Sequence, residues 1–385
     1  MEDLNDKAEA GLGELPVDWS LKPLVSVGEV LNGLTYAPSD VSGHGTLVLR
    51  SSNIQNDTLS FRDNVLVEMD IPERILVKPN DVLICVRNGS RALIGKTALL
   101  DERVTGMTFG AFMAVFRSPY GCFINCLFRS SLMKRQIDQH LGATINQITN
   151  GSLKSFLVPM PSGEPEIRAI ECALSDVDAL LERLDQLIAK KRDLKQAAMQ
   201  QLLTGQTRLP GFEGEWESKN LGALLRVRHG RDQKEIVKVG GRYPIWATGG
   251  EIGRTDTPLY DRPSVLIGRK GTIDAPRYVD KPFWTVDTLF YTEMVAGSSA
   301  RFLYYLFCTI PWKSFNEASG VPSLNARTIE GIEVVVPLPE EQAAIADVLH
   351  EFDMEIEALE KRRAKTANLK QAMMQELLTG RTRLV

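Results

Sequence analysis

The chain has 385 residues, more than the ~250–300 at which a single hydrophobic core stops growing, so we expect more than one domain. Its net charge of −4 excludes a strongly basic protein that coats DNA unaided. The opening MEDLNDKAEAGLGELP lacks the basic start and apolar core of a signal peptide, and no apolar run reaches ~18 residues, so we expect a cytoplasmic chain.

The cysteines and histidines predict neither a metal site nor catalysis. Of the five cysteines only Cys122 and Cys126 are close in sequence, and no neighbouring His or Cys completes a zinc set. The four histidines are far apart and suggest no catalytic group. The segment GSRALIGKT at 89–97 has five residues between its glycines where a P-loop needs four, so we expect no nucleotide there.

The first part of the chain, residues 15–155, has the texture of a β-rich globular part. Short apolar runs such as VLICV at 82–86 and FMAVF at 112–116 alternate with Gly, Asn and Pro. An apolar strand with a double-proline signal, VPMP at 158–161, ends this part.

A long helix is expected next. No Gly or Pro interrupts Glu166–Thr204, and Gly205 supplies a helix stop, so the segment predicts ~38 helical residues and a length of ~57 Å. Its apolar residues alternate by three and four, the spacing typical of a coiled coil. These packing residues are Ile167, Ile170, Leu174, Val177, Leu181, Leu184 and Ile188.

Residues 211–335 then repeat the β-rich texture, with SVLIG at 264–268 and IEVVVP at 332–337, and VPLP at 336–339 leads to a second helix. That helix is expected over Glu340–Thr379, before Gly380. Its packing residues are Ile345, Leu349, Phe352, Ile356 and Leu359.

The two helices are copies of one unit. LKQAAMQQLLTGQTRL at 194–209 and LKQAMMQELLTGRTRL at 369–384 agree at thirteen of sixteen positions without a gap. Self-similarity of this kind indicates a duplicated unit. The β-rich parts echo each other more weakly, through the turns VRNGSR and GRKGT and through the Asn-containing stretches NQITNGSLKSF and GVPSLNARTIEGI. Periodicity alone also fits a generic dimerisation coiled coil, but two copies in one chain favour pairing within the chain.

The order of globular part, helix, globular part, helix, with LKQAxMQxLLTGxTRL ending each helix, resembles the specificity subunits of type I restriction-modification systems. The resemblance implies an α+β fold of two target recognition domains separated by two long antiparallel coiled-coil helices, with a pseudo-twofold internal repeat. The expected division is 1–155 and 211–335 for the recognition domains, and 156–210 and 336–385 for the conserved helical regions.

The resemblance also implies a non-catalytic subunit with partners. Each recognition domain reads one half of a split, asymmetric target in double-stranded DNA, and the helices space the domains and dock two methyltransferase subunits. Restriction subunits join through the complex. S-adenosylmethionine is expected on the methyltransferase, and ATP and Mg on the restriction subunit, so no cofactor is expected here. Two alternatives stay open: a DNA-binding regulator or structural coiled-coil tether outside restriction-modification, and an enzyme with an unusual site.

Candidate DNA contacts are polar and basic residues in loops, because Arg can bind guanine O6 and N7, and Asn or Gln can bind adenine N6 and N7. The alternative for each is a solvated loop residue. In the first part we select Arg87, Asn88, Ser90, Arg91, Lys96, Thr144, Asn146 and Gln147. In the second part we select Arg226, Arg228, His229, Arg231, Lys234, Arg269, Lys270, Thr272 and Arg277.

Basic residues on the helices form a separate set. We expect them to decorate the helix surface, the alternative being contact with DNA between the half-sites. They are Lys190, Lys191, Arg192, Lys361, Arg362, Arg363 and Lys365.

The duplication predicts how half a chain behaves. Residues 1–210 or 211–385 alone keep one globular part and one helix whose apolar stripe lacks its partner. We expect each half to form a symmetric dimer. Sedimentation measures this directly, and a folded monomer would argue against pairing of the two helices within the full chain.

Overall fold

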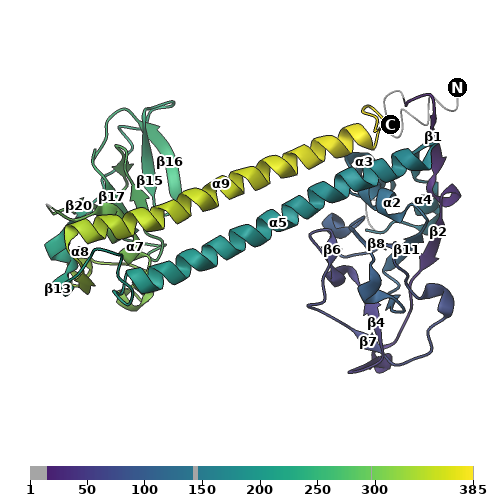
Figure 1. Ribbon diagram of the computed structural model, residues 1–385, viewed down its shortest axis with the longest axis horizontal. Helices are drawn as coiled ribbons and strands as arrows, with labels where there is room; N and C mark the ends of the chain where they lie inside the picture. The colour runs from purple at the N-terminus through teal and green to yellow at the C-terminus, as the bar shows by residue number, and fades with distance from the viewer. Residues whose placement is uncertain (1–14, 142–145, 296, 385) are drawn as a thin grey trace. The chain divides into compact units, whose positions relative to one another are not determined.

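A computed structural model describes residues 15–141, 146–295 and 297–384 (Figure 1). The chain forms two units, Met1–Leu184 with Arg362–Val385, and Asp185–Lys361. Each unit contains one β-rich globular part and segments of both long helices. This confirms the predicted α+β class. Among the described residues, no helix is long and apolar enough to cross a membrane.

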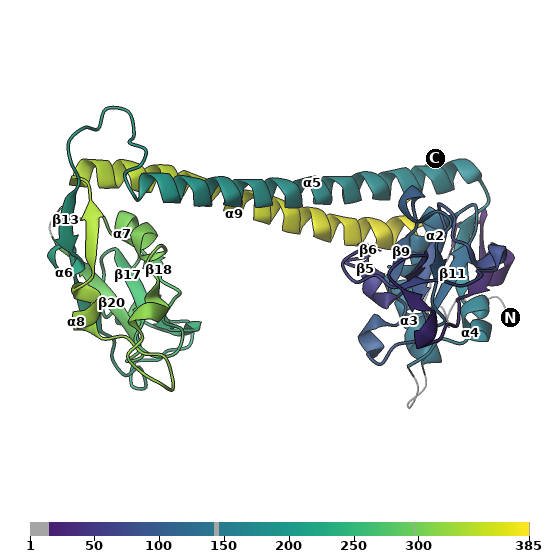
Figure 2. The ribbon, with the colours of Figure 1, turned by 90° about the horizontal axis from the view of Figure 1, so that it is seen from below.

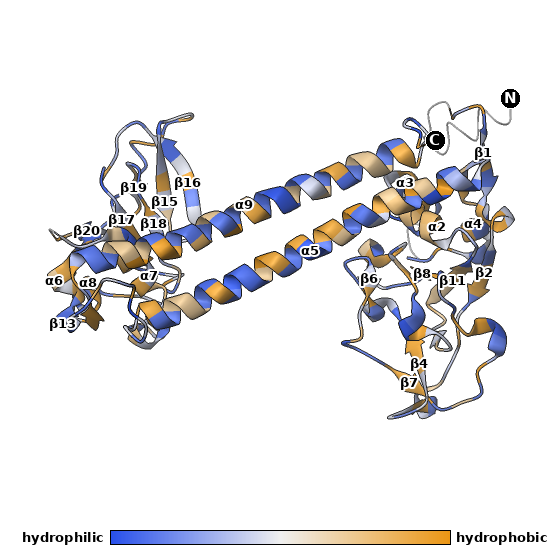
Figure 3. Cartoon of the chain, in the orientation of Figure 1, coloured by the Kyte–Doolittle hydropathy of each residue, from blue (hydrophilic) through white to orange (hydrophobic). Residues whose placement is uncertain are grey.

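The two long helices are α5, Glu164–Leu202, and α9, Pro339–Leu377, each of 39 residues. Both begin and end within about two residues of the predicted bounds. Gly205 and Gly380 follow them with the same φ of 71°, a left-handed conformation that ends a helix and that glycine adopts without strain. Figure 3 shows apolar and polar positions alternating along each helix.

Each globular part is built on the same four-stranded antiparallel sheet. In the first unit the strand order is β2-β11-β8-β9, and in the second it is β14-β20-β17-β18. The strands of the first sheet are β2 (Glu29–Asn32), β8 (Val82–Cys85), β9 (Thr97–Leu99) and β11 (Met113–Arg117). Those of the second are β14 (Leu225–His229), β17 (Ser264–Gly268), β18 (Arg277–Val279) and β20 (Leu289–Met294). The weak echo in sequence is therefore a repeat of topology.

A second sheet in each part contains one parallel strand pair. The first unit has the order β10-β4-β7-β3 and the second has β16-β15-β19. The parallel pairs are β10 with β4 and β15 with β19. The strands are β3 (Val41–Ser42), β4 (Thr46–Leu49), β7 (Leu66–Val67), β10 (Thr108–Phe109), β15 (Tyr243–Ala247), β16 (Gly250–Thr255) and β19 (Trp284–Thr285). Among the residues that the structure describes, a short hairpin of β5 (Ile54–Gln55) and β6 (Thr58–Leu59) occurs only in the first unit.

The strand before each long helix pairs with the first strand of the same globular part. In the first unit β1 (Trp19–Pro23) pairs with β12 (Leu157–Pro161), and in the second β13 (Glu217–Asn220) pairs with β21 (Glu333–Val336). The chain therefore returns to its entry point before each long helix begins. The predicted boundaries between globular and helical regions, at residues 155 and 335, stay predictions. The strand β12 begins just after the first boundary but pairs with β1 of the first globular part.

Short helices cover the sheets. In the second unit α7 packs on β17 and β18 (Figure 2). The helices of the first part are α2 (Gly121–Phe128), α3 (Ser131–His140) and α4 (Asn150–Ser155). Those of the second are α6 (Leu221–Leu224), α7 (Ala300–Phe307) and α8 (Ala326–Glu330).

The start of each long helix packs into the core of the globular part that precedes it. Ile167 and Leu174 of α5 join one core with Phe116, Phe123 and the end of α9. Ile345 and Leu349 of α9 join the other core with the end of α5. Ile170, Leu184, Ile188 and Ile356 are also buried, whereas Val177, Leu181, Phe352 and Leu359 are half-buried. Part of the predicted coiled-coil stripe therefore serves the globular cores.

Each unit has one repeat-related ion pair between its two helix segments, and the lysine of the pair is buried or half-buried. In the first, Lys370 pairs with Asp178, and the Lys370 side chain is only 9% exposed. In the second, Lys195 Nζ lies 2.5 Å from Asp353 Oδ1. Lys195 and Asp353 are the repeat partners of Lys370 and Asp178 at the offset of 175 residues. The pairs fix the register of the antiparallel segments, because a buried ammonium that lost its carboxylate would have to be desolvated unpaired.

A second pair of repeat-related contacts lies at the helix ends. Arg383, beyond the end of α9, contacts Glu166 at the start of α5 and donates to both carboxylate oxygens of Asp18 at 2.8 and 2.7 Å. These bonds hold the pKa of Asp18 below its ordinary value. In the second unit Arg208 Nε donates to Glu341 Oε1 at 2.6 Å. The repeated TRL ends therefore fold back onto the beginning of the other helix.

The Lys370–Asp178 pair makes a prediction about stability. The variant D178N leaves the buried ammonium without its counter-charge and also removes the 3.5 Å contact of Asp178 with Arg129, which keeps Asp57 as a partner. It should lower the stability of the first unit by roughly 1–3 kcal/mol, measured as an earlier urea unfolding transition. R168A is the matched control, because Arg168 pairs with Glu164 on the same helix at the surface and should change stability by less than about 0.5 kcal/mol. Equal effects of the two variants would contradict this role for Lys370.

Candidate nucleic-acid interface

The loop after β8 brings most of the first predicted set together. A backbone bridge pairs Arg87 with Gln147, and Asn146 Nδ2 donates to the carbonyl of Gly89 at 3.1 Å. Two chain segments separated by about sixty residues therefore form one polar edge. Arg87 and Ser90 are exposed there, and Asn146 and Gln147 are half-buried. Thr144 lies outside the described residues.

Asn88 is held by its own loop. Its Nδ2 donates to Ser51 Oγ at 3.1 Å, and its Oδ1 accepts from the backbone N–H of Ser90 at 2.9 Å. The second bond closes an Asx turn, which fixes the path of the loop. The side chain that the sequence selected to read adenine thus has one amide oxygen and one amide hydrogen engaged inside the protein. Its contact with DNA remains a prediction.

Arg91 and Lys96 lie apart from this edge. They line a cavity of 730 Å³ together with Arg129 and Lys134 of the first unit. Arg91 lies 3.8 Å from Asp138, and Lys96 Nζ donates to the carbonyl of Ile54 at 3.1 Å. The first predicted set is therefore divided between two places.

In the second unit, two predicted clusters meet at the start of β20. The ladder places His229 and Ile267 on either side of Phe290, and the His229 and Phe290 rings contact edge to face with centroids 4.9 Å apart. Arg269 and Lys270 follow directly after β17. His229, Arg231 and Lys270 are exposed and Arg269 is half-buried, so this end of the sheet presents several basic groups to solvent.

The other predicted residues of the second unit have partners or different surroundings. Arg228 pairs with Glu293 at 2.8 Å, which raises the pKa of Arg228, and Arg226 donates to the carbonyl of Gly222. Lys234 lies 3.6 Å from Asp232. Arg277 lies over the Trp246 ring, 4.3 Å from its centroid, and Thr272 is an exposed turn residue.

The turns VRNGSR and GRKGT occupy corresponding positions in the two sheets. The backbone N–H groups of Val86 and Arg87 donate to the carbonyl of Phe112, and those of Arg269 and Lys270 donate to that of Thr288. A bridge joins Lys270 to Ser323 as one joins Arg87 to Gln147. The Asn-containing stretches therefore also correspond. Both parts present the same type of loop edge with different side chains.

Metal and thiol chemistry have little support at these edges. Within residues 15–141, 146–295 and 297–384 no group of three His, Cys, Asp or Glu side chains could hold a metal ion. Cys85 ends β8 beside the first loop, and burial raises the pKa of its thiol to about 11, so it is protonated at neutral pH. What the edges offer is hydrogen-bond donors and positive charge, which suits base edges and phosphates.

The basic residues of the long helices are partly engaged in ion pairs. Lys191 lies 2.5 Å from Glu355, Arg192 lies 2.5 Å from Glu360, and Lys361 lies 2.6 Å from Glu357 on its own helix. These contacts agree with the expected surface role. Contact with DNA between half-sites remains the untested alternative.

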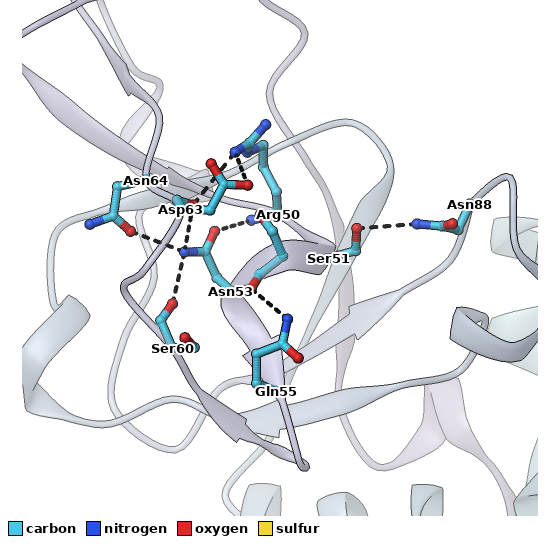
Figure 4. A network of polar contacts seen from close by, with 9 residues as sticks. Arg50, Ser51, Asn53, Gln55, Ser60, Asp63, Asn64 and Asn88 are labelled. Carbon is cyan, nitrogen blue, oxygen red and sulfur yellow. Dashed lines mark hydrogen bonds and ion pairs between the residues drawn. The ribbon is translucent and has the colours of Figure 1, made fainter. Parts of the chain in front are cut away.

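Sequence reasoning missed a polar group beside the first loop. Arg50 pairs with Asp63 at 3.0 Å, and Ser51 accepts the hydrogen bond from Asn88 (Figure 4). With Phe112 they line one cavity of 530 Å³. These residues come from three separate segments without a shared local pattern, so no periodicity or motif pointed to them.

Comparison with known proteins gives one family. Residues 213–368 match the model of the type I restriction modification DNA specificity domain. The StySPI specificity subunit of Salmonella potsdam is 29% identical over 55% of this chain and 49% of its own length. The EcoKI specificity subunit of Escherichia coli is 28% identical over 49% of this chain and 43% of its own length. These alignments thus span about half of either relative. The putative MjaX specificity subunit of Methanocaldococcus jannaschii is 25% identical over 97% of this chain and 96% of its own.

Solved structures share the fold. The type I restriction-modification S subunit from M. genitalium superposes with a TM-score of 0.65 at 17% identity, over 95% of this chain and 97% of that one. A chain from a study of the assembly of the type I system gives a TM-score of 0.58 at 18% identity, over 95% and 99%. At such low identity these likenesses concern the fold alone.

The Asx turn at Asn88 makes a prediction about the first loop. In N88A the backbone N–H of Ser90 loses its acceptor, so its hydrogen exchange should accelerate about fivefold, as expected when roughly 1 kcal/mol of hydrogen bonding is lost. In N88D the acceptor remains, and exchange at Ser90 should stay close to that of the parent. Amide exchange followed by NMR measures both variants. Equal acceleration in N88A and N88D would show that the Asn88 oxygen does not hold the loop.

Proposed function

Because this chain carries a type I restriction-modification DNA specificity domain and resembles specificity subunits along its length, we propose that it is the DNA-recognition subunit of a type I restriction-modification complex. The observation that carries the proposal is the duplication of one recognition fold, with the same strand order in both units, on two repeated helices. A protein that reads a split target needs two readers and a connection that keeps their distance constant.

Each globular part reads one half of a bipartite target. Support comes from the corresponding loop edges, which have one backbone framework but different side chains: Arg87 and Asn88 in the first part correspond to Lys270 and Gly271 in the second. Different donors at equivalent places favour different bases. The target is therefore asymmetric, and the long helices α5 and α9 space the two readers.

The chain itself carries no catalytic step. Two methyltransferase subunits dock on the helices, and restriction subunits join through the complex. S-adenosylmethionine is bound by the methyltransferase, and ATP and Mg by the restriction subunit. A net charge of −4 gives this chain no overall excess of positive charge for DNA phosphates, so its affinity for DNA depends on the partners.

The proposal is tested by expressing the full chain with its methyltransferase in a host without other adenine methylation and mapping the methylated sites. We expect a split motif that disappears without this chain. R87A should relax or change only the half read by the first part, and K270A only the other half, because each side chain is exposed on one loop edge. If both variants change the same half, or if the motif is unsplit, the assignment of one half to each part is wrong.

A further inference from the structure

The first globular part contains a cavity of 530 Å³, and none of the residues predicted to contact DNA lines it. Its lining comes from residues 34–36 after β2, residues 50–52 after β4, Asp63, and residues 110–113 at the start of β11. It thus lies where the two sheets of this part meet. Asn88, in the loop after β8 (residues 86–91, hereafter the recognition loop), connects to the cavity through its hydrogen bond with Ser51.

A framework of hydrogen bonds holds the polar wall of this cavity (Figure 4). Asn53, which is fully buried, accepts from the backbone N–H of Arg50 at 2.9 Å and donates to the carbonyl of Ser60 at 2.9 Å. It also donates to Asn64 Oδ1 at 3.1 Å. The segments that carry Arg50 and Asp63 are therefore tied together, and the Arg50 guanidinium reaches the Asp63 carboxylate at 3.0 Å.

Two polar atoms of the residues that form this wall have no hydrogen-bond partner. Arg50 Nε and Ser52 Oγ are buried and have no hydrogen-bond partner in the protein. A buried polar atom without a partner costs free energy, so these two atoms mark a part of the wall where hydrogen bonding is incomplete. The Arg50 side chain is 33% exposed and that of Asp63 is 65% exposed, so both can be reached from outside.

The opposite side of the cavity is aromatic. Phe112 is 58% exposed, unusually high for a large apolar residue, and Arg87 of the recognition loop lies over its ring at 5.0 Å from the centroid. Tyr36 lines the same cavity and is half-buried. An exposed ring beside hydrogen-bond donors and a carboxylate suits a flat, polar-edged ligand.

Among the groups that DNA can present, a nucleobase fits this cavity best. A phosphate would meet the Asp63 carboxylate and gain nothing from Phe112. The edge of a stacked base pair lies within a groove and cannot enter a concave site, whereas an extruded base can stack on an aromatic ring and be read along its pairing edge. Guanine matches the wall, because its O6 accepts from Arg50 while its N1–H and N2–H donate to Asp63.

The second globular part has no arginine at the position that corresponds to Arg50. The backbone N–H of Gly110 donates to the carbonyl of Leu49, and that of Val286 donates to Trp246 in the corresponding parallel strand pair. The residue after Leu49 is Arg50, and the residue after Trp246 is Ala247. A base pocket built on Arg50 therefore belongs to one half-site only, which supplies an internal control.

We propose that this cavity binds one guanine base extruded from the half-site of the first globular part, with Arg50 and Asp63 reading its pairing edge and Phe112 stacking on its face. The proposal rests on the proposed function, since it makes DNA the source of the base. It adds Arg50, Asp63 and Phe112 to the specificity-determining residues.

The test compares D63N and F112A with the matched control F61A in the full complex. Phe61 is also an exposed ring under an arginine, Arg103, at 5.4 Å, but it does not line the cavity. Methylation mapping should show that D63N and F112A relax one guanine of the first half-site by about tenfold, with the second half-site and F61A unchanged. An unchanged first half-site in both variants overturns the proposal. Circular dichroism confirms that each variant is folded.

A second measurement shows whether the cavity binds a guanine of DNA or the guanine of a free nucleotide. Calorimetry of the free chain with GMP and AMP should show weak binding of GMP that D63N abolishes, and 2-aminopurine beside the target guanine should brighten when the complex binds DNA. GMP binding combined with an unchanged half-site would mean that the cavity serves a free nucleotide, which overturns the proposal. If the parent complex gives no split motif, the proposed function has failed. If GMP does not bind to the free chain, the guanine pocket is overturned, whether or not the motif is split.

Discussion

The structure depends on two buried or half-buried lysines, each of which needs a carboxylate from the other helix. Lys370 with Asp178, and Lys195 with Asp353, occur once in each unit at repeat-related positions. A slip of one residue in the pairing of the helix segments would leave a largely desolvated ammonium without its partner, so each pair defines one register. The apolar contacts that surround them would tolerate small slips more easily. Charge therefore selects the arrangement, and burial supplies most of the stability.

This constraint accounts for the unequal similarity of the repeats. The helix ends face the same groups in both units: Arg383 meets Glu166, and Arg208 meets Glu341. Identical partners require identical residues, and thirteen of sixteen positions agree there. The globular parts keep their strand order but not their sequence. Many different apolar residues can fill a sheet core, and the residues of a loop vary with what the loop binds.

Sequence reasoning was strongest where signals are local. Periodicity and the stops at Gly205 and Gly380 predicted both long helices, and turn residues marked the loops at 87–91 and 269–272. It was weak where one cavity is lined by residues from distant segments of the chain. Arg50, Asp63 and Phe112 share one cavity but no motif. Nor could spacing show that Ile167 and Ile345 pack into globular cores, because a helix stripe looks the same against a helix or a sheet.

The two globular parts solve one problem with different side chains. Each uses a backbone carbonyl before a central strand, that of Phe112 or of Thr288, to hold the loop that follows β8 or β17. In the first part this residue also exposes an aromatic ring under Arg87, whereas in the second an arginine, Arg277, covers Trp246 of the other sheet. The framework is thus independent of the groups that it carries. Because the loop position is fixed by main-chain bonds, side chains at the edge can be exchanged without disturbing the helices; under the proposed function, such an exchange changes the base that is read.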